Sequence, residues 1–531
     1  MKNYLKHTGI ALLAAVAVVS APGCKKAEEK KTEPAKVDKA EDKKADKKED
    51  KKDDKKDEEP KAEDKKAEAP KVDDKKAEEP KKAEEPKKAE EPKKDDKAAT
   101  PPADKPADKP ADKPADANAT PPAPAAGAGP AYFGLMNKGL VKLDNGKFEV
   151  VLADAKFVKD IVKGKDGSIF AAAMAIHKIG TDGKAVEIGS FDNPGSVDHL
   201  AADLNGGNLY ATSYKGVHTY DGKSWSSEEK SKLGADVQLL SDVAVDGKGR
   251  LWVASSNALH VKDGGNWKTI DLTGVGKQGY KFFFKDFAIG ASGTVYAGHS
   301  SGVLKLGADD KASEVNTGSG FHSYSELAIG SGDTLVLGGI GEIVITAGDG
   351  KTTTYSEKGG NFKGKMIRGF TTDGQGRIWF AHENGMTVLD KDGKATDWLP
   401  GTVAELNDKI EVIYTVGSGP ALPTVGPQQK GNIKGKVIKA GTAIADADVE
   451  MCGSPAMFIK TTPCAEAAFK GAGKTDKDGN FEVKDVPIGN YGFAVKVDGK
   501  WTIYSMFNCC TEMKAGQTYD IGSITLRADS K

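Results

Sequence analysis

A short strand pattern repeats along the middle of the chain, and this repeat constrains the fold more than any other feature. Its best-formed copy, residues 241–255, has two apolar runs on either side of a Gly-containing turn, SDVAVDGKGRLWVAS. Copies recur about every 40 residues, which is the period of four-stranded propeller blades. Seven copies align, and they begin at Asp160, Asp198, Asp242, Asp286, Glu326, Gly369 and Val412. The sequence therefore predicts an all-β chain built around a seven-bladed β-propeller.

The two ends of the repeat region complement each other. Residues 131–152 are predicted to contain only the third and fourth strands of a blade, and residues 410–424 only the first and second strands. A ring closed by joining these ends has no unpaired strand edge. We therefore expect one propeller over residues 131–425, with a composite closing blade made from 131–152 and 410–424.

Two blades carry a more specific pattern in the turn between their first strands. Residues 246–270 contain DGKGRLW and residues 373–398 contain DGQGRIW. Both resemble the two-component-regulator propeller repeat, a family that often forms the periplasmic sensor half of histidine kinases. The resemblance implies an extracytoplasmic propeller, and no kinase segment accompanies it here.

The first residues have the pattern of a secretory signal. Lys2 and Lys6 precede an apolar stretch at residues 10–19 that is too short to span a bilayer. Small residues follow and end at Gly23-Cys24, which resembles a bacterial lipobox. The resemblance implies removal of residues 1–23 and diacylation of Cys24. We expect a lipid anchor in a bacterial membrane, the outer one where the host has two; an ordinary signal peptide with an incidental cysteine is the alternative.

Residues 24–130 consist almost entirely of Lys, Glu, Asp, Ala and Pro, in near-repeats such as KKAEEP and PADK. A segment without aromatic residues cannot bury enough apolar surface to fold, and its prolines prevent one long helix. The balanced charges give no basic patch for nucleic acid. We therefore predict a disordered tether and no nucleic-acid partner.

Residues 431–531 form a separate strand-rich region. TDKDGNF at 475–481 and VPIGNY at 486–491 resemble the carboxypeptidase-regulatory-like, transthyretin-like β-sandwich. All cysteines other than Cys24 lie here, namely Cys452, Cys464, Cys509 and Cys510. Four cysteines in a small exported domain predict two disulfides, with three connectivities open. Nearby methionines leave a Cu(I) site as the alternative, but we expect no resident metal or cofactor.

Acidic residues begin most of the innermost strands and should ring one end of the central channel. They are Asp160, Asp198, Asp242, Asp286 and Glu326. A ring of carboxylates can hold a cation or a cationic ligand. The alternative, favoured because the residue recurs in nearly every blade, is that each carboxylate accepts backbone hydrogen bonds from the neighbouring blade.

Aromatic residues and histidines gather in the loops expected on the same face of the propeller. The ligand-binding candidates are Tyr280, Phe282, His299, Phe321, His322, Tyr324 and His382. Aromatic side chains from adjacent blades can form a stacking platform for a sugar or a peptide. Some must be buried instead, and Phe283 or Phe284 is the expected one.

We predict no H-E-x-x-H pair, no quinoprotein docking repeat and no G-x-S-x-G nucleophile elbow in the propeller. The sequence thus favours a non-enzymatic, membrane-tethered binding or scaffold protein that presents a propeller face to an envelope protein, a peptide or a glycan. One alternative is a lyase- or hydrolase-type propeller enzyme that uses His299 or His382. A purely structural envelope protein is the other.

Overall fold

The computed structural model describes residues 128–153, 155–191, 197–276, 282–317, 324–455, 461–465, 467–505 and 509–527. Cys24, the signal and most of the predicted tether lie outside these ranges. Within them, regular structure consists of strands and three single-turn 3-10 helices at Lys230–Lys232, Ser331–Asp333 and Ala404–Leu406. None of the described helices is long and apolar enough to cross a membrane. The all-β prediction is confirmed.

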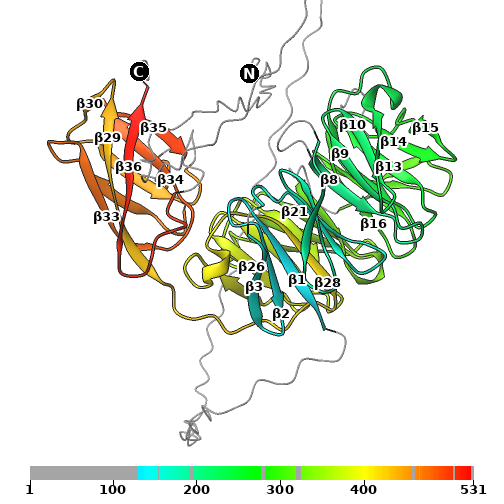
Figure 1. The fold of residues 1–531 in the computed structure, drawn as a ribbon, viewed down its shortest axis with the longest axis horizontal. Coiled ribbons are helices and arrows are strands. Elements are labelled where there is room, and N and C mark those ends of the chain that lie inside the picture. The colour runs from blue at the N-terminus through cyan, green and yellow to red at the C-terminus, as the bar shows by residue number, and fades with distance from the viewer. Residues whose placement is uncertain are drawn as a thin grey trace, which may run out of the picture. The chain divides into compact units, whose positions relative to one another are not determined.

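The strands from β1 to β28 form seven four-stranded sheets, which we number as blades in chain order (Figure 1). Blade 1 consists of β4 (Asp160–Lys163), β5 (Ile169–Ala172), β6 (Ile176–Ile179) and β7 (Ala185–Gly189). Blade 2 consists of β8 (Val197–Ala202), β9 (Leu209–Ser213), β10 (Gly216–Tyr220) and β11 (Trp225–Glu229). Blade 3 consists of β12 (Leu240–Val245), β13 (Leu251–Ser255), β14 (Leu259–Asp263) and β15 (Asn266–Thr269).

The remaining blades follow the same order. Blade 4 consists of β16 (Phe284–Ile289), β17 (Val295–His299), β18 (Gly302–Leu306) and β19 (Ala312–Glu314). Blade 5 consists of β20 (Tyr324–Ile329), β21 (Leu335–Gly339), β22 (Glu342–Thr346) and β23 (Thr352–Ser356). Blade 6 consists of β24 (Arg368–Thr372), β25 (Ile378–His382), β26 (Gly385–Leu389) and β27 (Ala395–Trp398). Blade 7 consists of β28 (Ile410–Gly417), β1 (Ala128–Leu135), β2 (Leu140–Asp144) and β3 (Lys147–Leu152).

The blades close into a ring. Each blade's first strand contacts the first strand of the next, from β4 through β28 and back to β4. In blade 7, β28 pairs antiparallel with β1, and Phe133 lies opposite Ile413. Figure 1 shows these two strands side by side although they come from opposite ends of the domain. The structure confirms the seven-bladed propeller and a closing blade built from both ends. The division of its strands differs from the expected two and two, because β1 supplies the second strand and β28 alone comes from the C-terminal end.

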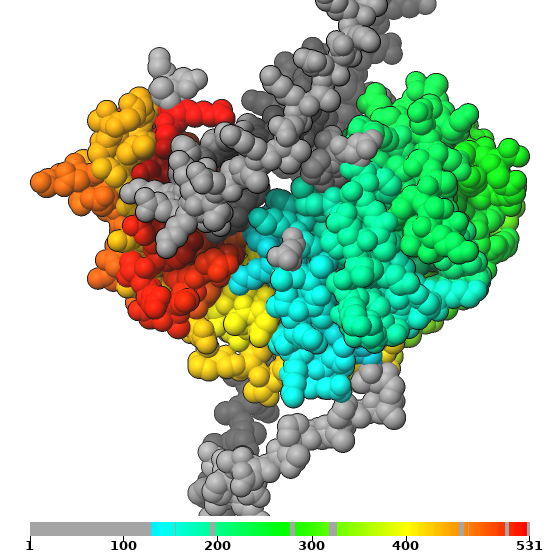
Figure 2. All heavy atoms as spheres, viewed as in Figure 1, coloured from blue at the N-terminus to red at the C-terminus, as the bar shows by residue number. Residues whose placement is uncertain are grey.

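The D-G-x-G-R-x-W turns are held together by their first residue. The Asp246 carboxylate accepts hydrogen bonds from the backbone N–H of Arg250 (3.0 Å), from Arg250 Nε (2.8 Å) and from the indole Nε1 of Trp252 (2.9 Å). Gly249 adopts a φ of 78°, a left-handed conformation that favours glycine. Trp252 is fully buried between blades 3 and 4, so the motif connects a surface turn to the core. Figure 2 shows the atoms at the start of the propeller (cyan) beside those near residue 400 (yellow).

The strands after the propeller form a β-sandwich, as predicted. One sheet contains β29 (Lys430–Lys439), β30 (Thr442–Ala443), β33 (Asn480–Pro487) and β36 (Thr518–Leu526), with β36 parallel to β29. The other contains β31 (Asp448–Cys452), β32 (Gly471–Lys474), β34 (Gly492–Val497) and β35 (Lys500–Ser505). Phe481 of the first sheet and Phe493 of the second meet in their shared core.

One disulfide closes a loop of this domain, between Cys452 at the end of β31 and Cys464. Cys509 and Cys510 lie side by side, and all four cysteine side chains are buried. The second predicted disulfide stays a prediction.

Candidate functional site

The first strands of five blades bring titratable side chains to one mouth of the central channel. These residues are Asp160, His199, Asp242, Asp286 and Glu326, and they line a cavity of about 350 Å³. Lys159, Lys285 and Glu411 also contribute to its wall. The predicted carboxylate ring therefore exists, and it is open enough to admit part of a ligand.

Asp198 is not a member of this ring, contrary to the sequence prediction. In blade 2, Leu200 pairs with Ala211 at the position where Val243 pairs with Val253 in blade 3. The residue equivalent to Asp242 is thus His199. The Asp198 side chain is 39% exposed and forms an ion pair with Lys159 at 2.6 Å.

Three of the aspartates tie neighbouring blades together. The backbone N–H groups that donate to them from the next blade are those of Leu200 to Asp160 (2.7 Å), Phe287 to Asp242 (2.6 Å) and Leu327 to Asp286 (2.9 Å). His199 Nδ1 lies 3.3 Å from Asp242 Oδ1. The favoured interpretation of the ring, backbone hydrogen bonding between blades, therefore describes these three residues.

Glu326 differs from the aspartates because its carboxylate accepts no hydrogen bond from any residue that the structure describes. Its pKa is raised well above the ordinary value, first by burial and then by the nearby charge of Asp286. Burial also raises the pKa of Asp160, of Asp242 and of Asp286, the last to about 6. The charges of Lys285 and Arg368 lower the pKa of Glu326, but burial has the larger effect.

The described residues contain no group of three or more His, Cys, Asp or Glu side chains placed to hold a metal ion. The carboxyl groups of the mouth are spread over separate blades, and three of them accept a backbone hydrogen bond from the next blade.

The aromatic platform predicted on blades 4 and 5 is not formed by Phe282. Phe282 and Phe284 are buried and stack with ring centroids 5.5 Å apart, whereas Phe283 is 56% exposed. Alternate residues of an extended segment point in opposite directions, so Phe282 and Phe284 enter the gap between blades together. The burial expected for Phe284 is correct, and the exposure expected for Phe282 is wrong.

The other members of the platform are outside what the structure describes or only partly within it. Tyr280, Phe321 and His322 fall in undescribed segments, and only the backbone of Tyr324 is placed, at the start of β20. Their role in ligand binding stays a prediction.

The two candidate histidines are buried rather than exposed on loops. His299 and His382 end β17 and β25, and burial lowers the pKa of each to about 4. His382 Nε2 lies 3.0 Å from Thr387 Oγ1, which in turn donates to Asp397 at 2.7 Å.

Similar buried contacts recur elsewhere in the ring. His218 lies between Ser213 and Ser227, at 2.8 and 2.7 Å, and the same arrangement occurs around His260. Hydrogen-bonded histidines within several blades are typical of structural residues. Catalysis by His299 or His382 gains no support from this geometry.

Residues 298–302 read GHSSG and match the G-x-S-x-G pattern, although no elbow of this kind is expected from the sequence. The pattern lies in the turn between β17 and β18, whereas a hydrolase nucleophile elbow joins a strand to a helix. Ser300 Oγ and His299 Nε2 are both buried without a hydrogen-bond partner. The local fold therefore argues against a hydrolase nucleophile.

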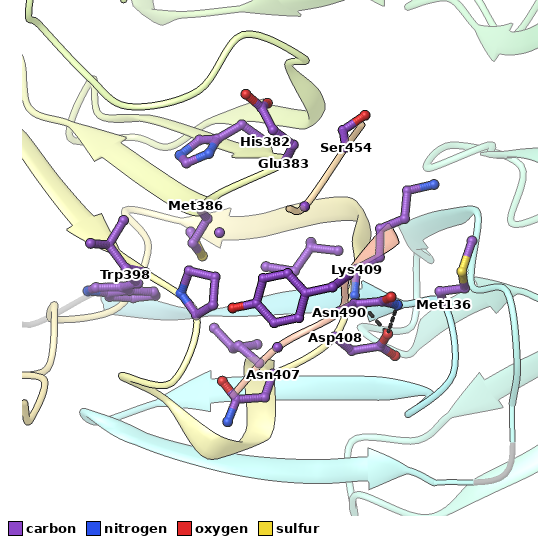
Figure 3. Close-up of a pocket in the computed structure, with 18 of the residues that line it drawn as sticks. Met136, His382, Glu383, Met386, Trp398, Asn407, Asp408, Lys409, Ser454 and Asn490 are labelled. Carbon is purple, nitrogen blue, oxygen red and sulfur yellow. Dashed lines mark hydrogen bonds between the residues drawn. The ribbon is translucent and has the colours of Figure 1, made fainter. Parts of the chain in front are cut away.

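A second cavity, of about 270 Å³, lies where loops of blades 6 and 7 meet the sandwich (Figure 3). The Gln429 N–H donates to Gly401 O at 2.8 Å, and Asn490 Nδ2 lies 3.4 Å from Asp408 Oδ1 across this junction. His382 is the one predicted ligand residue among the described side chains that line it. Nothing in the sequence pattern marks this cavity.

The sequence matches no protein-family model and no curated protein. Similar solved structures include virginiamycin B lyase from Staphylococcus aureus, at 13% identity over 47% of this chain and 86% of that chain, with a TM-score of 0.39. The extracellular domain of a proposed hybrid two-component system from B. thetaiotaomicron shows 13% identity over 51% and 46%, with a TM-score of 0.35. The WD40 β-propeller domain of Doa1 shows 10% identity over 45% and 81%, with a TM-score of 0.37. At these values the similarity concerns the fold.

Proposed function

We propose that this protein is an extracytoplasmic binding protein, anchored to a bacterial membrane through a lipid on Cys24, whose channel mouth binds a cationic organic group. The ligand class is a primary amine carried by a peptide, an envelope protein or an amino sugar. The observation that carries the proposal is the convergence of five carboxyl groups from five blades on one cavity, with Glu326 left without a hydrogen bond.

A cationic ligand would compensate the negative charges of the carboxyl groups at the channel mouth. Bringing carboxyl groups together in a half-buried cavity raises their pKa because ionisation becomes costly. A pKa shift of one unit corresponds to about 1.4 kcal/mol of difference between the two protonation states. An ammonium group within the mouth would interact with several carboxylates at once and offset this cost.

Calorimetry with a lysine probe tests the proposal. Nα-acetyl-lysine amide should bind at pH 7.5, whereas its Nε-acetylated form, which has no charge, should not. Glu326→Gln should weaken binding by roughly tenfold, the effect of losing about 1.4 kcal/mol. Asp349→Asn, which removes an exposed charge at the β22–β23 hairpin, is the matched control and should leave the affinity unchanged.

The pH dependence has a defined sign. The pKa of Asp286 is raised to about 6, so its carboxyl is ionised above that pH and neutral below it. Affinity for the amine should therefore fall as pH decreases through about 6. Equal binding of the charged and acetylated probes, or no binding of either, contradicts the proposal, and absence of binding favours a structural envelope protein.

A further inference from the structure

The cavity between the propeller and the sandwich combines an apolar wall with a few polar groups (Figure 3). Its apolar lining comes from Met136, Met386, Val403, Leu406 and Ile410. Pockets of this composition, placed at a domain junction, are typical small-molecule sites.

One charged hydrogen-bond donor in this lining lacks an acceptor. The Arg368 guanidinium forms no hydrogen bond or ion pair with the described part of the chain. Arg368 is half-buried, and its charge acts on Glu326 and on His382. A ligand carboxylate would give the guanidinium an acceptor.

The acidic side chains of the same lining are already occupied. Asp408 accepts backbone hydrogen bonds from Asn137 (2.7 Å) and Lys138 (3.0 Å). Glu383 accepts them from Lys365 (2.8 Å) and Met366 (2.8 Å). The oxygens of both carboxyl groups thus already have donors, and Lys409 is paired with Glu411. Arg368 is the charged group of the lining that is left to pair with a ligand.

Glycines on the sandwich side allow the two domains to approach while leaving the cavity open. A Cβ at Gly453 would lie 2.2 Å from the Glu383 carbonyl oxygen, and one at Gly489 would lie 2.9 Å from Pro400 Cβ. Both residues line the cavity without side chains that could fill it.

We propose that this cavity binds a small carboxylate with an apolar body. The Arg368 guanidinium pairs with the carboxylate, whose planar geometry matches the arginine fork. The methionine and aliphatic side chains contact the body. The Arg368 charge also acts on Glu326 of the channel mouth, so an Arg368 variant can change both sites. Ser454 lines only this cavity, and its substitution distinguishes failure of this site from failure of the amine site.

The experiment is calorimetric titration of the full chain with 3-phenylpropionate and, as the uncharged counterpart, 3-phenylpropionamide. The carboxylate should bind more tightly than the amide. Arg368→Gln should weaken carboxylate binding about tenfold or more, since hydrogen bonds to charged groups contribute that much, and Arg368→Lys should retain part of the affinity. Lys394→Gln removes an exposed charge from the hairpin between β26 and β27 of the same blade, and it should have no effect.

Ser454→Trp provides a second variant that does not alter the propeller. Ser454 is an exposed residue at the rim, and an indole there should obstruct entry and reduce binding. The proposal is overturned if the folded wild-type chain shows no saturable binding at millimolar concentration. Unchanged carboxylate affinity in either Arg368→Gln or Ser454→Trp would overturn it as well.

Discussion

The Asp242 carboxylate accepts a hydrogen bond of 2.6 Å from the backbone N–H of Phe287, which belongs to the next blade. One side chain thus joins two blades and lines the channel mouth. Asp242→Ala leaves that N–H unpaired and should lower the free energy of unfolding by about 1–3 kcal/mol. Asp242→Asn keeps an oxygen acceptor and removes the charge, so its loss should be smaller. Urea unfolding of the two variants compares these effects; equal losses would show that the acceptor is unimportant.

Acid should destabilise the propeller through its buried histidines. Burial lowers the pKa of His218, His260, His299 and His382 to about 4, against 6.5 for an ordinary histidine. Between these values the unfolded chain binds protons that the folded chain does not. The free energy of unfolding should therefore decrease as pH falls from 6.5 toward 4. The decrease should be on the order of 1 kcal/mol or more for each histidine.

Thermal unfolding of wild type and His260→Gln between pH 7 and 4.5 checks this expectation. The variant should be less stable at pH 7 and should lose less stability on acidification. The carboxyl groups of the channel mouth have raised pKa values and act in the opposite direction. The difference between the two proteins isolates the histidine, and parallel curves would contradict the prediction.

Adjacent phenylalanines in the loop before blade 4 should respond differently to truncation. Phe282→Ala removes a buried ring and should cost about 3–5 kcal/mol, whereas Phe283→Ala removes an exposed one and should cost less than about 0.5 kcal/mol. Chemical denaturation measures both. If Phe282→Ala lowers the free energy of unfolding only slightly, the Phe282 ring is exposed and a role in a stacking platform is supported.

The Cys452–Cys464 disulfide closes a short loop, with a sequence separation of 12 residues. Replacing both cysteines with Ser should lower the stability of the sandwich by about 2–4 kcal/mol. In the native, unreduced chain, alkylation should label none of the four C-terminal cysteines. Labelling of two or more would instead support the copper-site alternative.

Lipidation of Cys24 is expected from the small residues that precede it. Mass spectrometry of the membrane fraction should find a diacylated N-terminal peptide that begins at this residue. Cys24→Ser should release the protein from the membrane, and continued membrane association of a lipid-labelled variant would refute the assignment.

The propeller could be predicted from sequence because its signals are local. Each blade repeats apolar runs around a turn, and Asp246 and Trp252 recur as Asp373 and Trp379 with the same hydrogen bond, 2.9 and 2.8 Å long. The identity of His199 as a ring member was not predictable in this way. A shift of one residue exchanges the two faces of a strand, and the extra turn residues of blade 2 obscure the register.

The direction of a side chain in an extended loop is equally hard to predict from sequence. Phe282, Phe283 and Phe284 are chemically identical, and only packing between blades decides that the middle one is exposed. The second cavity depends on how Gly453 and Gly489 meet the propeller surface. Such a contact joins residues far apart in sequence, so no repeat or motif spacing in the sequence predicts it.

The pairing of β28 with β1 also sets the order in which the domain can be completed. The edge of β1 that contains Phe133 has no partner until β28, which contains Ile413, has been added. Blades 1 to 6 can form in sequence as the chain emerges, but β1 presents an open edge throughout that time. An open edge is a template for pairing with another chain. The last strand of the ring is thus also its protection against aggregation, and a truncation before residue 410 would remove that protection while leaving six whole blades.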